Sequence, residues 1–197
     1  MAVVHELPCI GLLLAAGSSQ RFGGDKRWHR LADGSPMALA TARTLKAAQL
    51  PSLAVLRPED TTLAERLQSA GLEIAINDEP AAGLGSSIAC GVKASANANG
   101  WLIVLADMPY VQAATIRQVA ACLAAGARIA APVHAGQRGH PVGFAHEFGP
   151  ALRQLKGEPG ARAILQQQAG YLETVPVNDP GILIDVDYRF GSGPRCG

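Results

Sequence analysis

A loop rich in small residues follows the first apolar run of the chain and carries two cations. It begins Leu14-Ala15-Ala16-Gly17-Ser18-Ser19 and continues through Arg21 to Lys26. Small residues let backbone N–H groups approach an anion closely and form a nest for phosphate oxygens, and the two cations can neutralise the outer phosphates. The loop therefore predicts polyphosphate binding. The alternative is a flexible Gly/Ser loop whose cations are only solvated.

The spacing of this loop excludes two common phosphate-binding motifs. The distance from Gly17 to Gly23 is one residue too long for a G-x-G-x-x-G fingerprint, and Lys26 is followed by Arg27 instead of the Ser or Thr of a P-loop. A nicotinamide-dependent reductase is consequently the weakest of the enzymatic hypotheses.

Acidic residues end two further apolar runs. Asp107 lies at the tip of the run 101–105, and a proline two positions later makes the chain leave the sheet at once. Asp185 and Asp187 end the run that starts at Ile182, where strand alternation would put both on one side. Because Mg²⁺ is held by one or two protein carboxylates together with substrate phosphates, Asp107 and Asp187 can form a metal site if their strands are neighbours. Taken alone, Asp107 is more simply a helix-capping residue.

Short apolar runs alternate with longer helical segments in the first half of the chain. Strands are expected at 8–14, 53–56, 73–76 and 101–105, and helices at 36–50, 61–70 and 86–96. The strands lack polar alternation, as expected of parallel strands covered on both faces. Alternating strands and helices predict an α/β fold of three layers, α/β/α, around a mostly parallel sheet. In such sheets ligands bind outside the carboxyl ends of the strands.

The pattern changes after position 125. A strand is expected at 128–132, a Gly/His-rich stretch at 134–144, short helices at 147–155 and 160–168, and closing strands at 171–175 and 182–186. His134, His140 and His146 are six apart, which would align them on one continuous strand. Gly139 and Pro141 interrupt any such strand, so a three-histidine metal site is not favoured.

The overall composition limits the function classes. The 197 residues include 17 Lys and Arg against 16 Asp and Glu, so no basic stripe for nucleic acid is expected. The four cysteines are scattered, which favours reduced thiols and a cytoplasmic location. The longest apolar run near the start is too short to span a bilayer. A single domain over 1–197 is expected.

Taken in order, the motifs resemble those of a known family. They comprise the loop from Leu14 to Lys26, followed by Gly83–Ile88, Leu105–Pro109, Arg138–Val142, Gly160–Arg162 and Asp185–Asp187. In this order they are similar to the molybdenum cofactor cytidylyltransferase family, nucleotidyltransferases with a Rossmann-like fold. The chain departs from the family after Asp187, where it reads Tyr188-Arg189-Phe190-Gly191 instead of Thr-Pro-Glu-Asp and a helix.

The resemblance implies a role for each matching residue. The triphosphate would be bound by the loop residues Leu14, Ala15, Ala16 and Gly17 together with the catalytic cations Arg21 and Lys26. The base or ribose would contact Ser86 and Ser87, and Mg²⁺ would be held by Asp107 and Asp187, with Asp185 the weaker candidate. Arg138, Gly139 and His140 would border the pterin-side pocket. A nucleotide-binding half then covers about 8–110 and an acceptor-side half about 111–190.

The implied reaction transfers CMP from CTP to the terminal phosphate of molybdopterin and releases pyrophosphate. The Ala15-Ala16-Gly17 form of the loop favours CTP over GTP within this resemblance. An acceptor phosphate is already an anion near neutral pH, so no general base is needed. Two alternatives stay open: nucleotidyl transfer to a sugar or polyol phosphate, and a non-catalytic nucleotide or cofactor carrier, such as a chaperone for a molybdenum enzyme.

Overall fold

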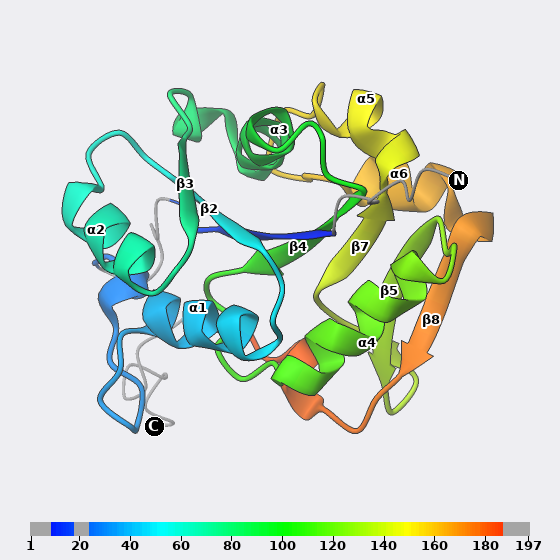
Figure 1. The fold of residues 1–197 in the computed structure, drawn as a ribbon, viewed down its shortest axis with the longest axis horizontal. Helices are drawn as coiled ribbons and strands as arrows, with labels where there is room; N and C mark the ends of the chain where they lie inside the picture. The colour runs from blue at the N-terminus through cyan, green and yellow to red at the C-terminus, as the bar shows by residue number, and fades with distance from the viewer. Residues whose placement is uncertain (1–8, 18–23, 187–197) are drawn as a thin grey trace, which may run out of the picture.

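A mixed β-sheet with helices on both faces forms the centre of the molecule (Figure 1). The structure is a computed structural model that describes residues 9–17 and 24–186. The strands are β1 (Ile10–Leu14), β2 (Ser52–Leu56), β3 (Glu73–Ile76), β4 (Gly100–Leu105), β5 (Ile129–His134), β6 (Gln137–Arg138), β7 (Val142–Ala145) and β8 (Leu172–Pro176). The helices are α1 (Met37–Ala47), α2 (Thr61–Ser69), α3 (Leu84–Ala94), α4 (Ala113–Ala124), α5 (Gly149–Leu152) and α6 (Arg162–Gln167). The predicted α/β/α fold is confirmed.

The first half of the sheet is parallel, in the order β3-β2-β1-β4. Its strands are apolar throughout because successive side chains enter two different cores. Leu13 packs in the core that includes residues of α1, α2 and α4, whereas Leu12 and Leu14 pack in the core that includes residues of α3, α5 and α6. The carboxyl ends of β1, β2 and β4 consequently meet at one edge, as the sequence predicts.

The second half of the sheet is mixed. Strand β7 lies between β4 and β5 and runs antiparallel to both, while β8 runs parallel to β5. Both β6 and β7 fall in the stretch that the sequence analysis described only as Gly/His-rich. A two-residue turn of left-handed residues, Ala135 (φ 49°) and Gly136 (φ 78°), joins β5 to β6. Hairpin turns of this kind usually carry Asn or Gly at the first position, so Ala135 gives no hairpin signal.

The closing strand predicted at 182–186 is wrong. Pro180–Leu183 form a short 3₁₀ helix, and residues 184–186 are not in a strand. The buried carboxylate of Asp179 accepts hydrogen bonds from the Gly181 N–H at 3.0 Å and the Thr115 hydroxyl at 2.6 Å. This cap starts a helical turn at Pro180, and proline suits the first helical position. The apolar residues Ile182 and Leu183 therefore belong to the turn and not to a strand.

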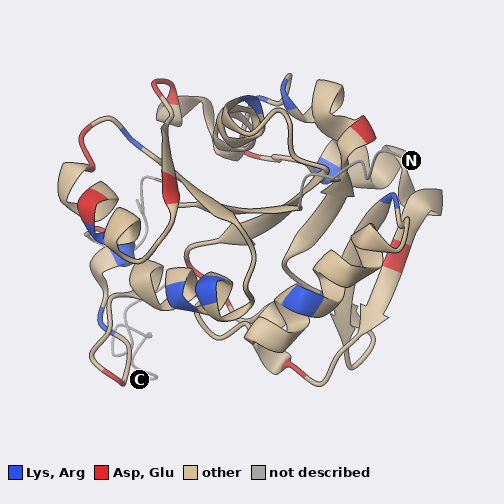
Figure 2. Ribbon diagram, viewed as in Figure 1, with Lys and Arg blue, Asp and Glu red and all other residues tan. Residues whose placement is uncertain are grey.

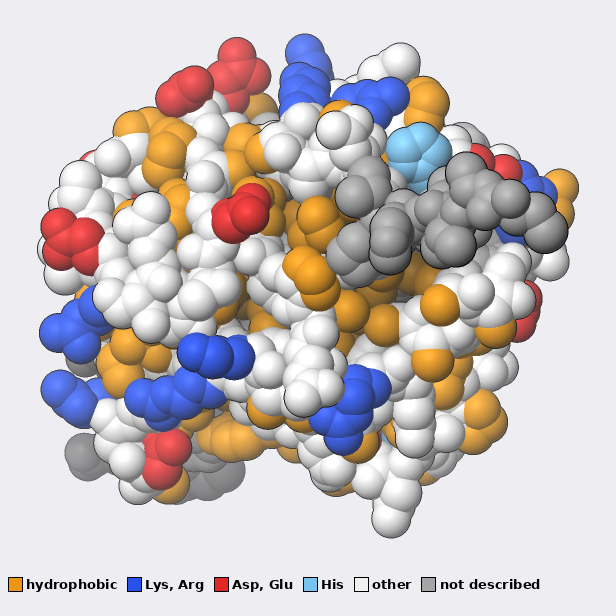
Figure 3. All heavy atoms as spheres, in the orientation of Figure 1, with side chains coloured by type: hydrophobic (Ala, Val, Ile, Leu, Met, Phe, Trp, Pro, Cys, Tyr) orange, Lys and Arg blue, Asp and Glu red, His pale blue; other side chains and the backbone are white. Residues whose placement is uncertain are grey.

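The surface carries charges of both signs. Figure 2 shows Lys and Arg as well as Asp and Glu on the helices and connections, and the face in Figure 3 shows hydrophobic atoms between the charged side chains. No helix within residues 9–17 and 24–186 is long and apolar enough to cross a membrane.

Two of the three evenly spaced histidines bind separate parts of the backbone. Nδ1 of His134 contacts the Val177 carbonyl, and Nδ1 of His146 contacts the Ala98 carbonyl.

Candidate functional site

The loop after β1 and the residue after β4 lie side by side at the carboxyl edge of the sheet. The Ala106 N–H donates to the Leu14 carbonyl at 3.2 Å, and the Ala15 N–H donates to the Val55 carbonyl at 3.0 Å. These bonds continue the pairing of β1 with β4 and β2 beyond the strands. Asp107 therefore emerges next to the small-residue loop.

A cavity of about 270 Å³ opens at this edge and is called the first cavity here. Its lining includes Leu14–Gly17, Lys26, Arg27, Pro80, Gly83, Ser87 and Asp107. The structure thus brings together the described part of the predicted loop, the predicted lysine and the predicted carboxylate. Arg21 and Asp187, the other two predicted residues with charged side chains on this side, lie outside the described residues.

Lys26 and Asp107 form an ion pair across the first cavity. The Lys26 Nζ lies 2.6 Å from Asp107 Oδ2, and both side chains are about one-fifth exposed. Lys26 starts a 3₁₀ helix, Lys26–Trp28, whose first turn is capped by Asp25 through the Arg27 N–H. A lysine ammonium in this place can neutralise phosphate oxygens or be exchanged for another cation on the carboxylate.

The second oxygen of Asp107 meets the requirement for a metal ligand. Asp107 Oδ1 is buried and accepts no hydrogen bond from the described residues. A buried carboxylate oxygen without a donor is costly unless another partner satisfies it. The Val186 N–H donates to the Asp107 carbonyl at 2.9 Å, so the segment bearing Asp185 docks beside Asp107. Within residues 9–17 and 24–186 no group of three His, Cys, Asp or Glu side chains surrounds this oxygen. Asp107 therefore fits a divalent cation as a single carboxylate ligand, with substrate phosphates completing the oxygen shell.

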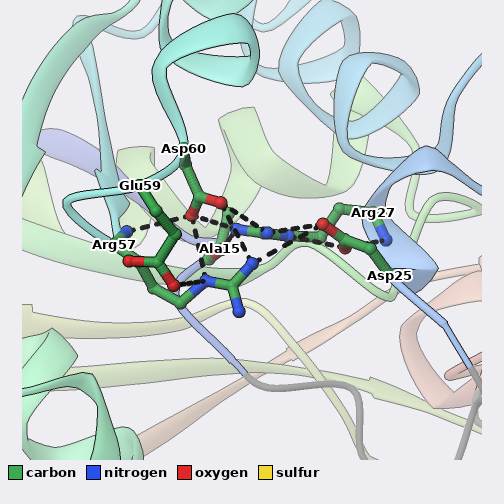
Figure 4. A network of polar contacts seen from close by, with 6 residues as sticks. All are labelled: Ala15, Asp25, Arg27, Arg57, Glu59 and Asp60. Atoms are coloured by element: carbon green, nitrogen blue, oxygen red, sulfur yellow. Dashed lines mark hydrogen bonds and ion pairs between the residues drawn. The ribbon is translucent and has the colours of Figure 1, made fainter.

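A buried arginine in the lining of the first cavity, which sequence reasoning did not select, joins three segments of the chain through hydrogen bonds and ion pairs (Figure 4). Arg27 is 3% exposed and donates to the Ala15 carbonyl at 2.7 Å, to both carboxylate oxygens of Asp60, and to both oxygens of Asp25. Arg57 also binds Asp60, at 3.0 Å. Burial alone lowers the pKa of the Arg27 guanidinium, but the hydrogen bonds and charges of Asp25 and Asp60 outweigh it and raise the pKa.

The two predicted serines on α3 have different positions. Ser87 lines the first cavity. Ser86 is buried and does not line it: its hydroxyl donates to the Gly83 carbonyl at 2.8 Å and accepts from the Asn77 amide at 3.0 Å. Ser86 therefore shapes the start of α3. The Ser87 hydroxyl is also buried and accepts a hydrogen bond from the Asn77 amide at 3.2 Å, but Ser87 lines the first cavity.

A second cavity, of about 230 Å³, lies against the first. The two share Leu84 and Leu105 in their walls. Most of the second cavity is apolar, and among the described residues that line it only Arg138, His140 and Arg162 carry polar side chains. Arg162 belongs to the motif Gly160–Arg162, for which the sequence predicts no separate role.

Gly139, predicted beside these residues, has a structural task. Its N–H donates to the Pro132 carbonyl at 3.0 Å, and a Cβ on it would lie 2.2 Å from the Ile182 carbonyl oxygen. The His140 N–H donates to the same Ile182 carbonyl at 3.1 Å. Only glycine allows this close approach of two backbones, which docks the segment carrying Asp185.

The surroundings of His140 favour the neutral form of its imidazole. Burial lowers the pKa of its imidazole below the ordinary value, and the nearby charge of Arg138 acts in the same direction. A hydrogen bond with the Ile103 backbone and the charges of Asp107 and Asp185 oppose this shift without cancelling it. Nδ1 of the ring is buried and has no hydrogen-bond partner among the described residues. A neutral imidazole with one unsatisfied nitrogen can bind a polar group of a ligand.

Known proteins are similar to this chain in sequence and in fold. The chain is 27% identical to the purine catabolism protein PucB of Bacillus subtilis (strain 168), over 90% of this chain and 91% of that protein. The structure of the Rv0371c homologue from Mycobacterium sp. strain JC1 superimposes with a TM-score of 0.78, at 26% identity over 91% of this chain and 90% of that one. A nucleotidyl transferase from Methanothermobacter thermautotroptrophicus superimposes with a TM-score of 0.76, at 20% identity over 92% of both chains.

The family match covers most of the chain. A family model described as the MobA-like NTP transferase domain matches residues 11–172, which contain the first cavity's described charged residues and the whole lining of the second cavity. Nucleotidyl transfer is the class of reaction that this family supports. The chain belongs to the MobA-like NTP transferase domain family.

Proposed function

We propose that this chain is a Mg²⁺-dependent cytidylyltransferase that transfers CMP from CTP to the terminal phosphate of a molybdopterin-type acceptor and releases pyrophosphate. The observation that carries the proposal is the contact of the two cavities. The first cavity is lined by the Ala15–Gly17 backbone, a lysine and a carboxylate at the edge of a parallel sheet. The second cavity has an apolar wall with two arginines, and it shares Leu84 and Leu105 with the first. Two substrates can thus meet at Asp107.

The first cavity would hold the nucleotide. The triphosphate would lie against the Ala15–Gly17 backbone and Lys26, and the base or ribose would lie toward Gly83 and Ser87. Asp107 would hold Mg²⁺, with Asp187 or Asp185 as the second carboxylate. When bound, the metal would neutralise phosphate charge and orient the α-phosphate.

The proposed reaction requires alignment more than proton transfer. An oxygen of the acceptor phosphate attacks the α-phosphorus of CTP, the bond to the bridging oxygen breaks, and the electron pair leaves with pyrophosphate. The attacking oxygen is already ionised near neutral pH, so the chain supplies no base. Its own contribution is to hold two repelling anions in line and to place the Lys26 ammonium where it stabilises the departing charge.

The second cavity supports a flat acceptor that has a polar edge and an anionic group. Its walls include Ile88, Ile103 and Phe144, and its charges come from Arg138 and Arg162. The flat faces of a pterin can pack against these apolar walls while Arg138, Arg162 and His140 bind its polar edge and its phosphate, whereas the puckered ring or open chain of a sugar or polyol has no flat apolar face to pack there. The molybdopterin-type acceptor is therefore preferred. We propose that the nucleotide and acceptor halves act within one domain.

Pyrophosphate release tests the proposal. The protein is incubated with Mg²⁺, molybdenum-loaded molybdopterin and each NTP in turn, and pyrophosphate is measured. We expect release with CTP and little with GTP. Release with a sugar phosphate in place of molybdopterin would reassign the acceptor, and no release with any NTP would favour a non-catalytic carrier.

A further inference from the structure

We propose that Arg27 is a positioning residue that sets both Lys26 and the Ala15–Gly17 backbone for the triphosphate. The inference rests on the proposed nucleotide binding. It concerns a side chain that has no assigned role in that proposal, although it lies in the lining of the first cavity.

Arg27 and Lys26 are neighbours that bind partners on different segments of the protein. Lys26 is paired with Asp107 after β4, whereas Arg27 is paired with Asp60 before α2. Asp25, on the other side of Lys26 in the chain, also accepts from the Arg27 guanidinium at 2.7 Å. The backbone that carries Lys26 is thus fixed on both sides, which restricts where its ammonium can go.

Arg27 also sets the direction of a peptide group in the loop. Its Nη1 donates to the Ala15 carbonyl at 2.7 Å, in a buried contact. In a planar trans peptide the carbonyl and the next N–H point in opposite directions. Fixing the Ala15 carbonyl therefore fixes the direction of the Ala16 N–H, and Ala16 is one of the residues that line the first cavity.

Stability alone does not explain a charged group in this place. A buried ion pair contributes little net stability because desolvation offsets the attraction, and an apolar replacement is often as stable. Arg27 is 3% exposed and Asp60 is 7% exposed, so both have lost most of their hydration. An arginine is suited to the task because its planar fork can bind a carbonyl and two carboxylates at once, which a lysine cannot do.

Equilibrium binding of a non-hydrolysable CTP analogue with an α,β-methylene bridge, measured by calorimetry with Mg²⁺ present, tests this inference. We expect Arg27→Leu and Arg27→Lys to weaken binding about tenfold or more, and Asp60→Asn to weaken it several-fold. Arg128→Leu is the matched control, because Arg128 pairs with Glu147 on the exterior and should bind as the wild type does. Thermal unfolding establishes that each variant is folded at the temperature of the measurement.

A double variant separates positioning from a general structural effect. If Arg27 acts through Lys26, then Lys26→Met should weaken binding of the CTP analogue less in the Arg27→Leu protein than in the wild type. The loss of affinity in the double variant should then be smaller than the product of the losses in the two single variants. A folded Arg27→Leu variant with wild-type affinity would overturn this inference and leave the proposed function standing. A double variant whose loss of affinity equals the product of the single losses would do the same. Should Arg27→Leu not fold, Arg27→Lys and Asp60→Asn decide in the same way. Failure of the wild type to bind any nucleotide overturns the proposed function and this inference with it.

Discussion

The two cavities differ in how their charged groups are held. In the first, cations and carboxylates bind one another: Lys26 with Asp107, and Arg27 with Asp60. In the second, Arg138 and Arg162 stand in a mainly apolar wall. The first cavity is preorganised for charge, which suits the stabilisation of a reacting polyphosphate. Under the proposed function, the second would bind its acceptor through apolar contact and a few oriented polar groups, as small-molecule sites usually do.

The largest expected effect follows from removing the carboxylate of the first cavity. Asp107→Asn keeps the shape of the side chain but removes the charge that would hold the metal. We expect the rate of pyrophosphate release to fall by about 10²–10³-fold, the range found when one preorganised electrostatic group is lost. The measurement is the initial rate with CTP, Mg²⁺ and acceptor. Glu65→Gln, an exposed carboxylate on α2, is the control, and near-normal turnover in Asp107→Asn would remove Asp107 from the mechanism.

A smaller and different effect is expected in the second cavity. Arg162→Leu removes a guanidinium while keeping an apolar wall, and should raise the KM of the acceptor by about 10–100-fold, as for a lost hydrogen bond to a charged group. The affinity for the CTP analogue should not change. Arg117→Leu, on the exposed side of α4, is the control. An unchanged acceptor KM, or a matching loss of nucleotide affinity, would contradict the division of tasks between the cavities.

The close backbone contact between Gly139 and Ile182 can be tested by measuring stability. Gly139→Ala places a Cβ 2.2 Å from the Ile182 carbonyl oxygen, so one backbone must move. We expect the free energy of unfolding to fall by about 1–3 kcal/mol, as for other overpacked sites. Urea unfolding measures the loss. Gly170→Ala meets no atom within 4 Å and has no left-handed φ, so it serves as the control. Equal losses in the two variants would mean that the contact with Ile182 is unimportant.

The smallest effect concerns the pH dependence of stability. Burial lowers the pKa of His140 in the folded protein below its ordinary value of 6.5. Just below pH 6.5 the unfolded chain therefore binds a proton at this imidazole more readily than the folded chain does. Stability should therefore be lost as the pH falls from the unfolded pKa toward the folded one. We expect His140→Gln to show a smaller loss of unfolding free energy between pH 7.5 and 5.5 than the wild type. An identical loss in both proteins would show that His140 is not the group responsible.

Much of the first cavity could be predicted from the sequence because its parts are local. The apolar runs 10–14 and 100–105 specify parallel strands buried on both faces, and the residues that follow such strands must share one edge. Lys26 and Asp107 were selected for that reason, and the structure pairs them. The network around Arg27 was missed because its partner Asp60 lies 33 residues away in another loop, and no periodic pattern relates two residues in separate loops.

The acceptor side was less predictable because its structure depends on distant contacts. Strand β7 is only four residues long and gains its place by pairing with both β4 and β5. Helix α4 was not predicted, although it covers the sheet beside β5. The apolar residues Ile182 and Leu183 have the pattern of a strand, but they lie in a 3₁₀ helix that Asp179 caps. The buried Asp179 carboxylate accepts a hydrogen bond from the hydroxyl of Thr115, which is far away in the chain.

Transfer of isotope from labelled CTP tests the central claim most directly, namely that the two cavities form one site for nucleotidyl transfer at Asp107. The protein is incubated with Mg²⁺, acceptor, and CTP labelled at either the α- or the γ-phosphorus. We predict that the α-label appears in the acceptor product and the γ-label only in pyrophosphate, with neither transfer in Asp107→Asn. Label from the γ-phosphorus in the acceptor, or α-label recovered only as free CMP, would contradict the account.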